Sequence, residues 1–176
     1  MSSPTIAMDT YLAIVSLRAI RKYASDPLPD DILQRILQAG RATGSSRNRQ
    51  PWLFYVVSNR DVLSQLAGTV SSPGNIAGCQ VAIALVLTSK NTFDGGRAAQ
   101  NMMLAAWAHG VGSCPNRPRN PEEVQRLLGI TDEVTIPTIL SMGYPAELVG
   151  PRDTDPDAIL GRINRKPLEQ LVRFIR

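Results

Sequence analysis

A stretch of small, hydroxyl and amide residues between two apolar segments is the clearest candidate for ligand binding in this sequence. It runs from Ser45 to Trp52 and leads directly into the apolar run 53–57. Its neutral hydrogen-bonding side chains belong to Ser45, Ser46, Asn48 and Gln50. Hydroxyl and amide groups at this spacing suit a polyol chain or the polar edge of a heteroaromatic ring. Any polar loop carries such groups, so the stretch alone does not identify a ligand.

Two arginines nearer the N-terminus, Arg18 and Arg21, are spaced three residues apart. Asp9 is expected to cap a helix that begins at Thr10, and both arginines share one face if that helix continues through them. Two guanidinium groups on one face can form charge-assisted hydrogen bonds with a single phosphate. A solvated basic helix end that complements the helix dipole explains the same spacing, so both interpretations stay open.

The cysteines and the single histidine argue against several kinds of chemistry. His109 is the only histidine, which excludes a multi-histidine metal site, and we expect a capping or surface role for it. Cys79 and Cys114 lack the spacing of a metal or dithiol site, so structural roles are expected for both. The Gly110–Gly112 turn lacks the continuation of a dinucleotide-binding motif, which makes a separate NAD(P) domain improbable.

Composition and charge favour a single domain without a membrane segment. The chain has 176 residues and is 43% hydrophobic, which suits one core. Its longest apolar run, 81–87, is far shorter than the roughly 20 residues of a membrane-spanning helix and predicts a buried strand. The N-terminus lacks the features of a signal peptide, so we expect a cytoplasmic protein. The net charge of +4 comes from dispersed basic residues without a nucleic-acid-binding motif, and an anionic small molecule accounts for it equally well.

Hydrophobic periodicity and breaker residues predict alternating helices and strands. A helix that starts at Thr10 precedes the basic segment, and Asp94-Gly95-Gly96 is expected to precede a central helix with a small-residue face. The segment 147–157 is expected to be an extended surface connection, followed by an apolar C-terminal arm that suits packing on another subunit. The other predicted segments are helices at 32–40, 61–67 and 121–128, a turn-rich connection at 70–75, strands at 53–58, 81–87 and 135–142, and a strand or loop at 113–116.

Three motifs together resemble the FMN-dependent nitroreductase family. They are Leu17–Tyr23, Ser45–Trp52 and Asn164–Glu169, which stand in the family's order and span nearly the whole chain. The resemblance implies an α+β fold with a mainly antiparallel sheet flanked by helices, over residues 1–176 as one domain. It also implies a homodimer with two FMN sites at the interface and the C-terminal arm on the partner.

The resemblance implies which residues bind the cofactor. Arg18, Arg21 and Arg165 match basic positions that hold the flavin phosphate. The stretch Ser45–Trp52, hereafter the polar loop, matches the segment near the ribityl chain and ring. The segment from Cys114 to Asn116 corresponds to the one that runs along the flavin ring. The complete set of expected cofactor-binding residues is Arg18, Ala19, Arg21, Ser45, Ser46, Asn48, Gln50, Cys114, Pro115, Asn116 and Arg165.

This sequence departs from the family pattern at four positions. Ala19 stands where serine is frequent, and Gly44 stands where proline is frequent. Arg47 replaces a small residue, and Arg117 replaces a residue that is acidic in some relatives. The departure at Arg117 is expected to alter the preference for cofactor or substrate.

The activity implied by the resemblance is reduction of nitroaromatics, quinones or related electrophiles by NAD(P)H. The donor and the electron acceptor would use one pocket in turn, which gives ping-pong kinetics. The flavin N5 atom would carry the hydride, with no catalytic side chain and no metal. Two alternatives stay open: a specialised superfamily member that oxidises a substrate, dehalogenates or fragments flavin, and a flavin-binding or storage protein without efficient turnover.

Overall fold

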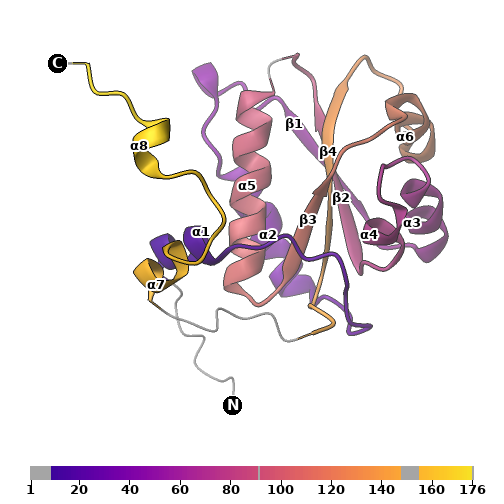
Figure 1. Cartoon of the computed structure of the whole chain (residues 1–176). Helices are drawn as coiled ribbons and strands as arrows, with labels where there is room; N and C mark the ends of the chain where they lie inside the picture. The colour runs from indigo at the N-terminus through magenta and orange to yellow at the C-terminus, as the bar shows by residue number, and fades with distance from the viewer. Residues whose placement is uncertain (1–8, 91, 148–154, 176) are drawn as a thin grey trace.

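A four-stranded antiparallel sheet forms the centre of the protein, with helices on both faces (Figure 1). The computed structural model describes residues 9–90, 92–147 and 155–175. The strand order is β1-β2-β4-β3, and each neighbouring pair is antiparallel. This architecture confirms the predicted α+β fold with an antiparallel sheet. The strands are β1 (Trp52–Val57), β2 (Val81–Leu87), β3 (Gly112–Asn116) and β4 (Thr135–Gly143).

Two groups of helices cover the two faces of the sheet. Helices α2 and α5 contribute to the apolar core on one face, while α3, α4 and α6 contribute to the core on the other face. Helix α1 packs against α5 and α7. The helices are α1 (Thr10–Ser16), α2 (Asp30–Arg41), the short 3₁₀ helix η1 (Ser46–Asn48), α3 (Arg60–Ala67), α4 (Pro73–Ala77), α5 (Phe93–Ala108), α6 (Pro121–Leu128), α7 (Pro156–Leu160) and α8 (Leu168–Leu171).

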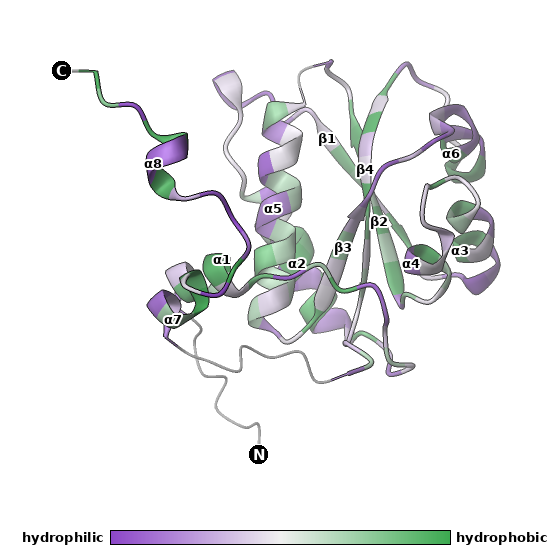
Figure 2. Cartoon of the chain, viewed as in Figure 1, coloured by the Kyte–Doolittle hydropathy of each residue, from purple (hydrophilic) through white to green (hydrophobic). Residues whose placement is uncertain are grey.

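Strand β2 joins the two cores, because its side chains alternate between the faces of the sheet. Val81, Ile83, Leu85 and Leu87 pack on the side of α2 and α5, whereas the three residues between them pack on the other side. All seven residues of the strand are buried, as the continuous apolar run predicted. Figure 2 shows the contrast between the largely apolar middle of the sheet and the mixed polar and apolar helices.

Glycines allow the central helix α5 to lie close to its neighbours. A Cβ atom on Gly40 of α2 would lie 2.9 Å from Met102 Cγ of α5. A Cβ atom on Gly95 of α5 would lie 2.8 Å from Leu87 Cδ1 of the sheet. Both separations are shorter than side-chain carbon atoms tolerate, so the backbones approach only because these side chains are absent. The predicted close packing of the central helix is therefore confirmed.

Helix α1 begins as predicted but ends earlier. The Asp9 carboxylate caps it by accepting hydrogen bonds from the amides of Tyr11 and Leu12 at 2.9 and 3.1 Å. The helix stops at Ser16, and the following backbone is extended, with Ile20 N donating to Ser113 O at 2.9 Å. Pairing with the outer edge of β3 thus replaces further helical hydrogen bonds. The condition for a shared helical face, continuation of the helix through both arginines, is not met.

Two further segments differ from the sequence prediction. Helix α5 begins at Phe93 rather than after Gly96, because Gly96 N already donates to Thr92 O at 2.8 Å. The connection at 70–75 contains the start of α4, where Pro73 occupies the first turn and loses no hydrogen bond there.

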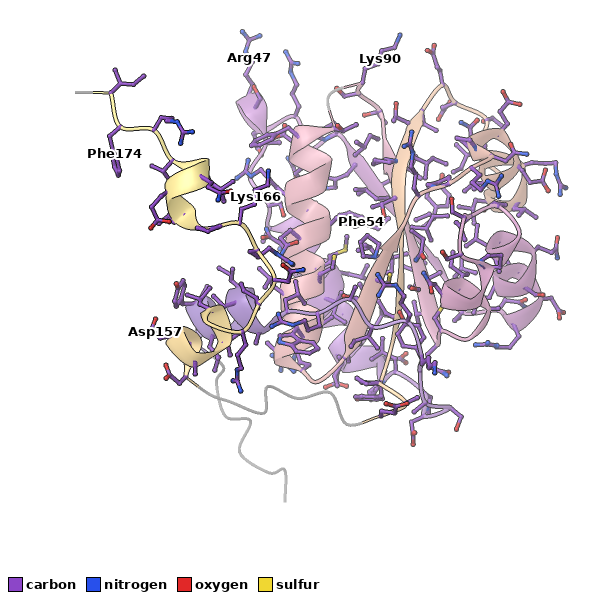
Figure 3. The ribbon with its side chains drawn as sticks, viewed as in Figure 1. Arg47, Phe54, Lys90, Asp157, Lys166 and Phe174 are labelled. Atoms are coloured by element: carbon purple, nitrogen blue, oxygen red, sulfur yellow. The ribbon has the colours of Figure 1, made fainter. Side chains whose placement is uncertain are left out.

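The C-terminal segment leaves the body of the protein after α7 (Figure 1). Most of the predicted surface connection, 148–154, lies outside the described residues, and its end forms part of α7. In the tail, Leu168 and Leu171 are 68% and 62% exposed, and Phe174 and Ile175 are 83% and 97% exposed. Figure 3 shows the Phe174 side chain on the part of the tail that extends away from the rest of the protein. These apolar side chains make the tail a candidate for contact with another copy of the chain.

Candidate functional site

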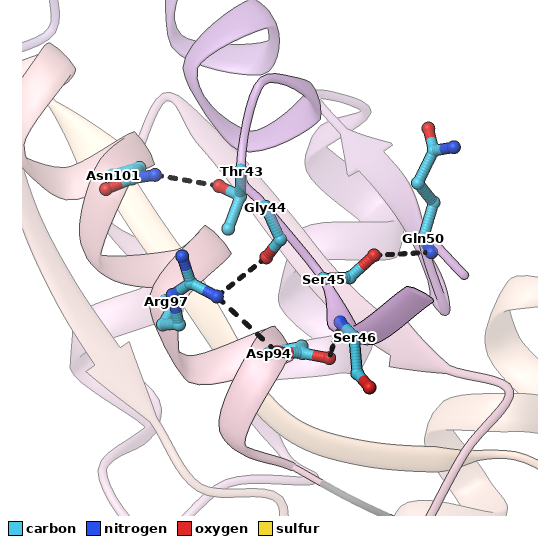
Figure 4. Close-up of polar contacts among 8 residues, drawn as sticks. All are labelled: Thr43, Gly44, Ser45, Ser46, Gln50, Asp94, Arg97 and Asn101. Atoms are coloured by element: carbon cyan, nitrogen blue, oxygen red, sulfur yellow. Dashed lines mark hydrogen bonds and ion pairs between the residues drawn. The ribbon is translucent and has the colours of Figure 1, made fainter. Parts of the chain in front are cut away.

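The polar loop between α2 and β1 is tied to the first half of α5 (Figure 4). Asn101 Nδ2 donates to Thr43 Oγ1 at 2.8 Å, and Arg97 Nη1 donates to the Gly44 carbonyl at 2.9 Å. The Ser46 amide donates to the buried Asp94 carboxylate at 3.2 Å. The central helix therefore sets the position of the loop through side chains of three of its turns.

Three non-glycine residues of this loop adopt left-handed backbone conformations. The φ angles of Arg47, Asn48 and Gln50 are 53°, 53° and 48°. Each such residue costs about 1–2 kcal/mol, with less for asparagine, so the surrounding contacts must hold them in place. The side chains of Asn48 and Gln50 are exposed, while Ser45 Oγ accepts from Gln50 N at 2.8 Å. Backbone strain of this kind clusters at ligand-binding segments.

Arg18 and Arg21 lie in different environments. Arg18 Nη1 donates to the Val15 and Leu17 carbonyls at 2.9 and 2.8 Å, so this side chain caps the C-terminal end of α1. Residues three apart in extended backbone point to opposite sides, which separates the two guanidinium groups. Arg21 instead lies beside Cys114 and faces the other side of the segment.

Arg21 lines a small polar pocket of about 150 Å³ at the outer edge of the sheet, hereafter the Arg21 pocket. Burial raises the pKa of the Cys114 thiol, whereas the charge of Arg21 and its hydrogen bond act in the opposite direction. The lining residues are Arg21, Ser71, Ser72, Asn75, Cys114, Pro115, Asn116 and Arg117. The pocket therefore combines one expected phosphate-binding residue with the segment expected to run along the flavin ring.

A buried hydrogen-bond network forms the floor of this pocket. Asn75 Nδ2 donates to Asn116 Oδ1 at 2.8 Å, and Asn116 Nδ2 lies 3.1 Å from Ser141 Oγ. Tyr23 Oη lies 2.9 Å from the same hydroxyl, and burial raises the pKa of this tyrosine well above its usual value. Because the Asn75 amide nitrogen donates to Asn116, the amide oxygen of Asn75 can still accept a hydrogen bond from another group.

Asn75 is a candidate functional residue that the sequence interpretation missed. Its segment was predicted as a turn-rich connection, and the contact that identifies it joins residues 41 positions apart. No local pattern in the sequence signals this pairing.

The polar loop and the Arg21 pocket lie at opposite edges of the sheet. The loop leads into β1, and the pocket contains the end of β3, with β2 and β4 between these two edge strands. The two edge strands β1 and β3 are three strand spacings apart, which corresponds to about 14 Å. Arg165 is exposed and donates to the neighbouring Asn164 carbonyl at 2.9 Å. One copy of the chain thus does not bring all the expected cofactor-binding residues together.

A groove of about 450 Å³ lies beside β1 and next to the polar loop. As an edge strand, β1 has one side without strand pairing, and Leu53 and Val56 on it are 48% and 40% exposed. Such an edge is able to accept another extended segment. The lining residues are Leu37, Gln38, Arg41, Gln50, Trp52, Leu53, Phe54 and Val56.

The described residues contain neither a metal-binding cluster nor a membrane-spanning helix. Among the described residues there is no group of three or more His, Cys, Asp or Glu side chains that could hold a metal ion. Within the same residues, no helix is long and apolar enough to cross a membrane.

The fold and the pocket define an α+β protein with a helix-covered antiparallel sheet and a polar pocket lined by two arginines at the sheet edge. Residues 14–78 and 87–144 match the family model described as the nitroreductase family. A protein of Methanothermobacter thermautotrophicus, provisionally named NADH dehydrogenase/NAD(P)H nitroreductase, is 33% identical over 165 residues, 86% of this chain and 86% of that protein. The chain therefore belongs to the nitroreductase family.

Two more relatives cover most of the chain. The NADH dehydrogenase of Thermus thermophilus is 26% identical in an alignment of 190 positions, gaps included, that spans 84% of this chain and 92% of that protein. A crystal structure from Desulfovibrio desulfuricans, provisionally described as a nitroreductase in complex with FMN, has a TM-score of 0.75 at 24% identity. That similarity covers 100% of this chain and 99% of the other, and it supports the same fold.

Proposed function

We propose that this chain, with residues 1–176 as one domain, is an FMN-dependent oxidoreductase that uses NAD(P)H to reduce nitroaromatics, quinones or related electrophiles. Family membership and the names of the relatives support this class of reaction. The observation that carries the proposal is the Arg21 pocket, where Arg21 and Asn75 meet the segment from Cys114 to Asn116.

The residues present fit the chemistry of FMN. The pyrimidine edge of a flavin ring offers two carbonyl oxygens and one N–H group, which require donors and an acceptor. Arg21 supplies donors, and the Asn75 carboxamide oxygen supplies an acceptor because its nitrogen donates to Asn116. The phosphate requires separate cations, and Arg18 and Arg165 are the matching exposed candidates. When bound, FMN supplies a ring that accepts hydride from NAD(P)H and delivers electrons to the acceptor.

We propose that two copies of the chain complete each site. The polar loop and the Arg21 pocket lie at opposite sheet edges of one copy, so a two-fold partner is needed to bring a loop to a pocket. The exposed tail from Leu168 to Ile175 is the proposed arm on the partner, and the groove beside β1 is the surface proposed to receive it. Burying each large apolar side chain would contribute about 1.5–3 kcal/mol to association.

The protein's own groups bind and orient in this proposal rather than transfer protons. His109 terminates α5 and does not line the Arg21 pocket. The donor and the acceptor then occupy one site in succession, which predicts parallel double-reciprocal lines in steady-state kinetics. An intersecting pattern would show a ternary complex and contradict this order of binding.

The visible spectrum and rapid reduction of the purified protein test the proposed function. We expect a yellow protein that releases FMN rather than FAD and whose flavin absorbance is bleached rapidly by NADPH or NADH. Addition of a nitroaromatic or a quinone should restore the absorbance. A bound flavin that stays inert would favour a flavin-binding or storage protein, and a colourless protein that does not take up FMN would refute the assignment.

A further inference from the structure

Arg117 adds a second guanidinium group to the Arg21 pocket. The described residues that line this pocket include two arginines, two serines and two asparagines, but no acidic residue. The carbonyl groups of a flavin ring edge satisfy one guanidinium group through hydrogen bonds. Those carbonyl groups would bring no full negative charge to the second guanidinium group. The charge of that second group would therefore stay uncompensated beside the proposed ring site.

The backbone on both sides of Arg117 is fixed, while its side chain is exposed. On one side, Asn116 is only 4% exposed, and its carboxamide nitrogen donates to the Cys114 and Ile139 carbonyls at 2.9 and 3.1 Å. On the other side, Pro118 pairs with Val70. Arg117 therefore lines the pocket from a backbone that is held on both sides, and it is exposed to solvent.

The next arginine along the chain provides a contrast. Arg119 N donates to Thr69 O at 2.7 Å, which anchors its backbone in the same loop. Its side chain is also exposed, but it does not line the pocket. Arg119 therefore has the same charge and a similar backbone anchor without a place at the proposed site.

We propose that Arg117 selects substrates by binding a carboxylate or phosphate group of the molecule that exchanges electrons with the flavin. This inference rests on the proposed function and names the substrate class: anionic acceptors, or NADPH through its 2′-phosphate, which NADH lacks. A guanidinium group forms paired, charge-assisted hydrogen bonds with either oxyanion. The exposed hydroxyls of Ser71 and Ser72 offer further donors in the same pocket.

A pair of acceptors that differ only in charge tests the proposal. The ratio of kcat/KM for 4-nitrobenzoate to that for 4-nitrobenzamide should fall about tenfold in Arg117→Ala, because one charge-assisted contact is lost. Arg117→Lys should recover much of the ratio, whereas Arg119→Ala should leave it unchanged. Calorimetric titration of the FMN-loaded protein with benzoate, which is not reduced, should show the same order of affinities.

The donor provides the second arm of the experiment. If the oxyanion belongs to the donor, the NADPH to NADH ratio of kcat/KM should fall in Arg117→Ala while the acceptor ratio stays constant. The proposal is overturned if neither ratio changes, or if the only effect is weaker FMN binding. Reduction of 4-nitrobenzamide by the wild-type protein separates failure of this inference from failure of the proposed function, because that neutral acceptor does not depend on the anion contact.

Discussion

The Ser46 amide and the Asp94 carboxylate are joined by a hydrogen bond of 3.2 Å that connects the polar loop to the first turn of α5. The same carboxylate lies 3.6 Å from Arg97 Nη1, and Arg97 holds the Gly44 carbonyl. Two residues of one helix thus hold a loop that contains three strained backbone positions. The position of the loop therefore depends on contacts with the central helix.

Asp94→Ala should weaken both the fold and the binding of FMN. The variant removes the acceptor of Ser46 N and the ion-pair partner of Arg97, and we expect a loss of about 1–2 kcal/mol in the free energy of unfolding. Denaturant unfolding and FMN fluorescence titration measure the two effects. Asp61→Ala, in the exposed first turn of α3, is the control and should change neither quantity by a similar amount. Unaltered FMN affinity in Asp94→Ala would show that the loop does not contribute to the site.

Arg18→Ala, Arg21→Ala and Arg165→Ala should each weaken FMN binding by about tenfold or more, because each loses a charge-assisted hydrogen bond to the cofactor. Arg173→Ala is the matched control, since this exposed arginine donates to the nearby Glu169 and Val172 carbonyls and matches none of the expected cofactor-binding positions. Fluorescence titration gives the four dissociation constants. If all four variants bind FMN alike, the phosphate and ring contacts proposed here are wrong.

Removal of the tail after Gly161 should abolish both the dimer and the bound FMN. A milder change, Phe174→Ser combined with Ile175→Ser, should weaken the dimer because it removes the apolar surface proposed to lie on the partner. Ile14→Ser serves as the control, because Ile14 is 51% exposed but lies on α1, outside the tail and the groove. Light scattering reports the mass of each variant. A stable monomer that retains FMN would refute the shared site.

The stability of the protein should decline as the pH rises from 9 towards 11. Burial raises the pKa of the Cys79 thiol from 9.0 to about 11, so the unfolded chain releases this proton at lower pH than the folded chain. The stability that the protonated Cys79 thiol contributes is fully present below pH 9, the pKa in the unfolded chain. It is lost as the pH rises towards 11, the pKa in the folded protein, and the loss is about 2 kcal/mol. Cys79→Ala should show a shallower decline in denaturant unfolding over this range. Equal slopes for the variant and the wild type would contradict the assignment.

Local patterns predicted the elements whose ends and faces are determined within a few residues. Helix α6 follows the Asn120 cap, carries Pro121 in its first turn and ends at Gly129, whose φ angle is 66°. The continuous apolar run of β2 identified the strand that is buried on both faces. In each case the signal and the structure involve the same short segment.

Long-range contacts determined what the sequence interpretation missed. Helix α1 ends at Ser16 because the chain then pairs with β3 at Ser113, which helical spacing does not reveal. The role of Asn75 depends on Asn116 in another strand. The strand order places the loop residues and Arg21 at opposite edges of the sheet, which local sequence patterns do not reveal. A site at a dimer interface, which the resemblance implies, is compatible with that separation. Sequence motifs named the candidate parts of the site, and we propose that two copies of the chain combine them.

A mixed dimer tests the central claim, that a loop from one copy and a pocket from the other form each FMN site. One variant carries Asn48→Ala with Gln50→Ala in the loop, and the other carries Arg21→Ala with Asn75→Ala in the pocket. Neither variant should retain FMN as a homodimer. Their heterodimer, purified through two different affinity tags, combines one intact loop with one intact pocket and should contain one FMN per dimer. A heterodimer without FMN, or either homodimer with two, would contradict the shared site.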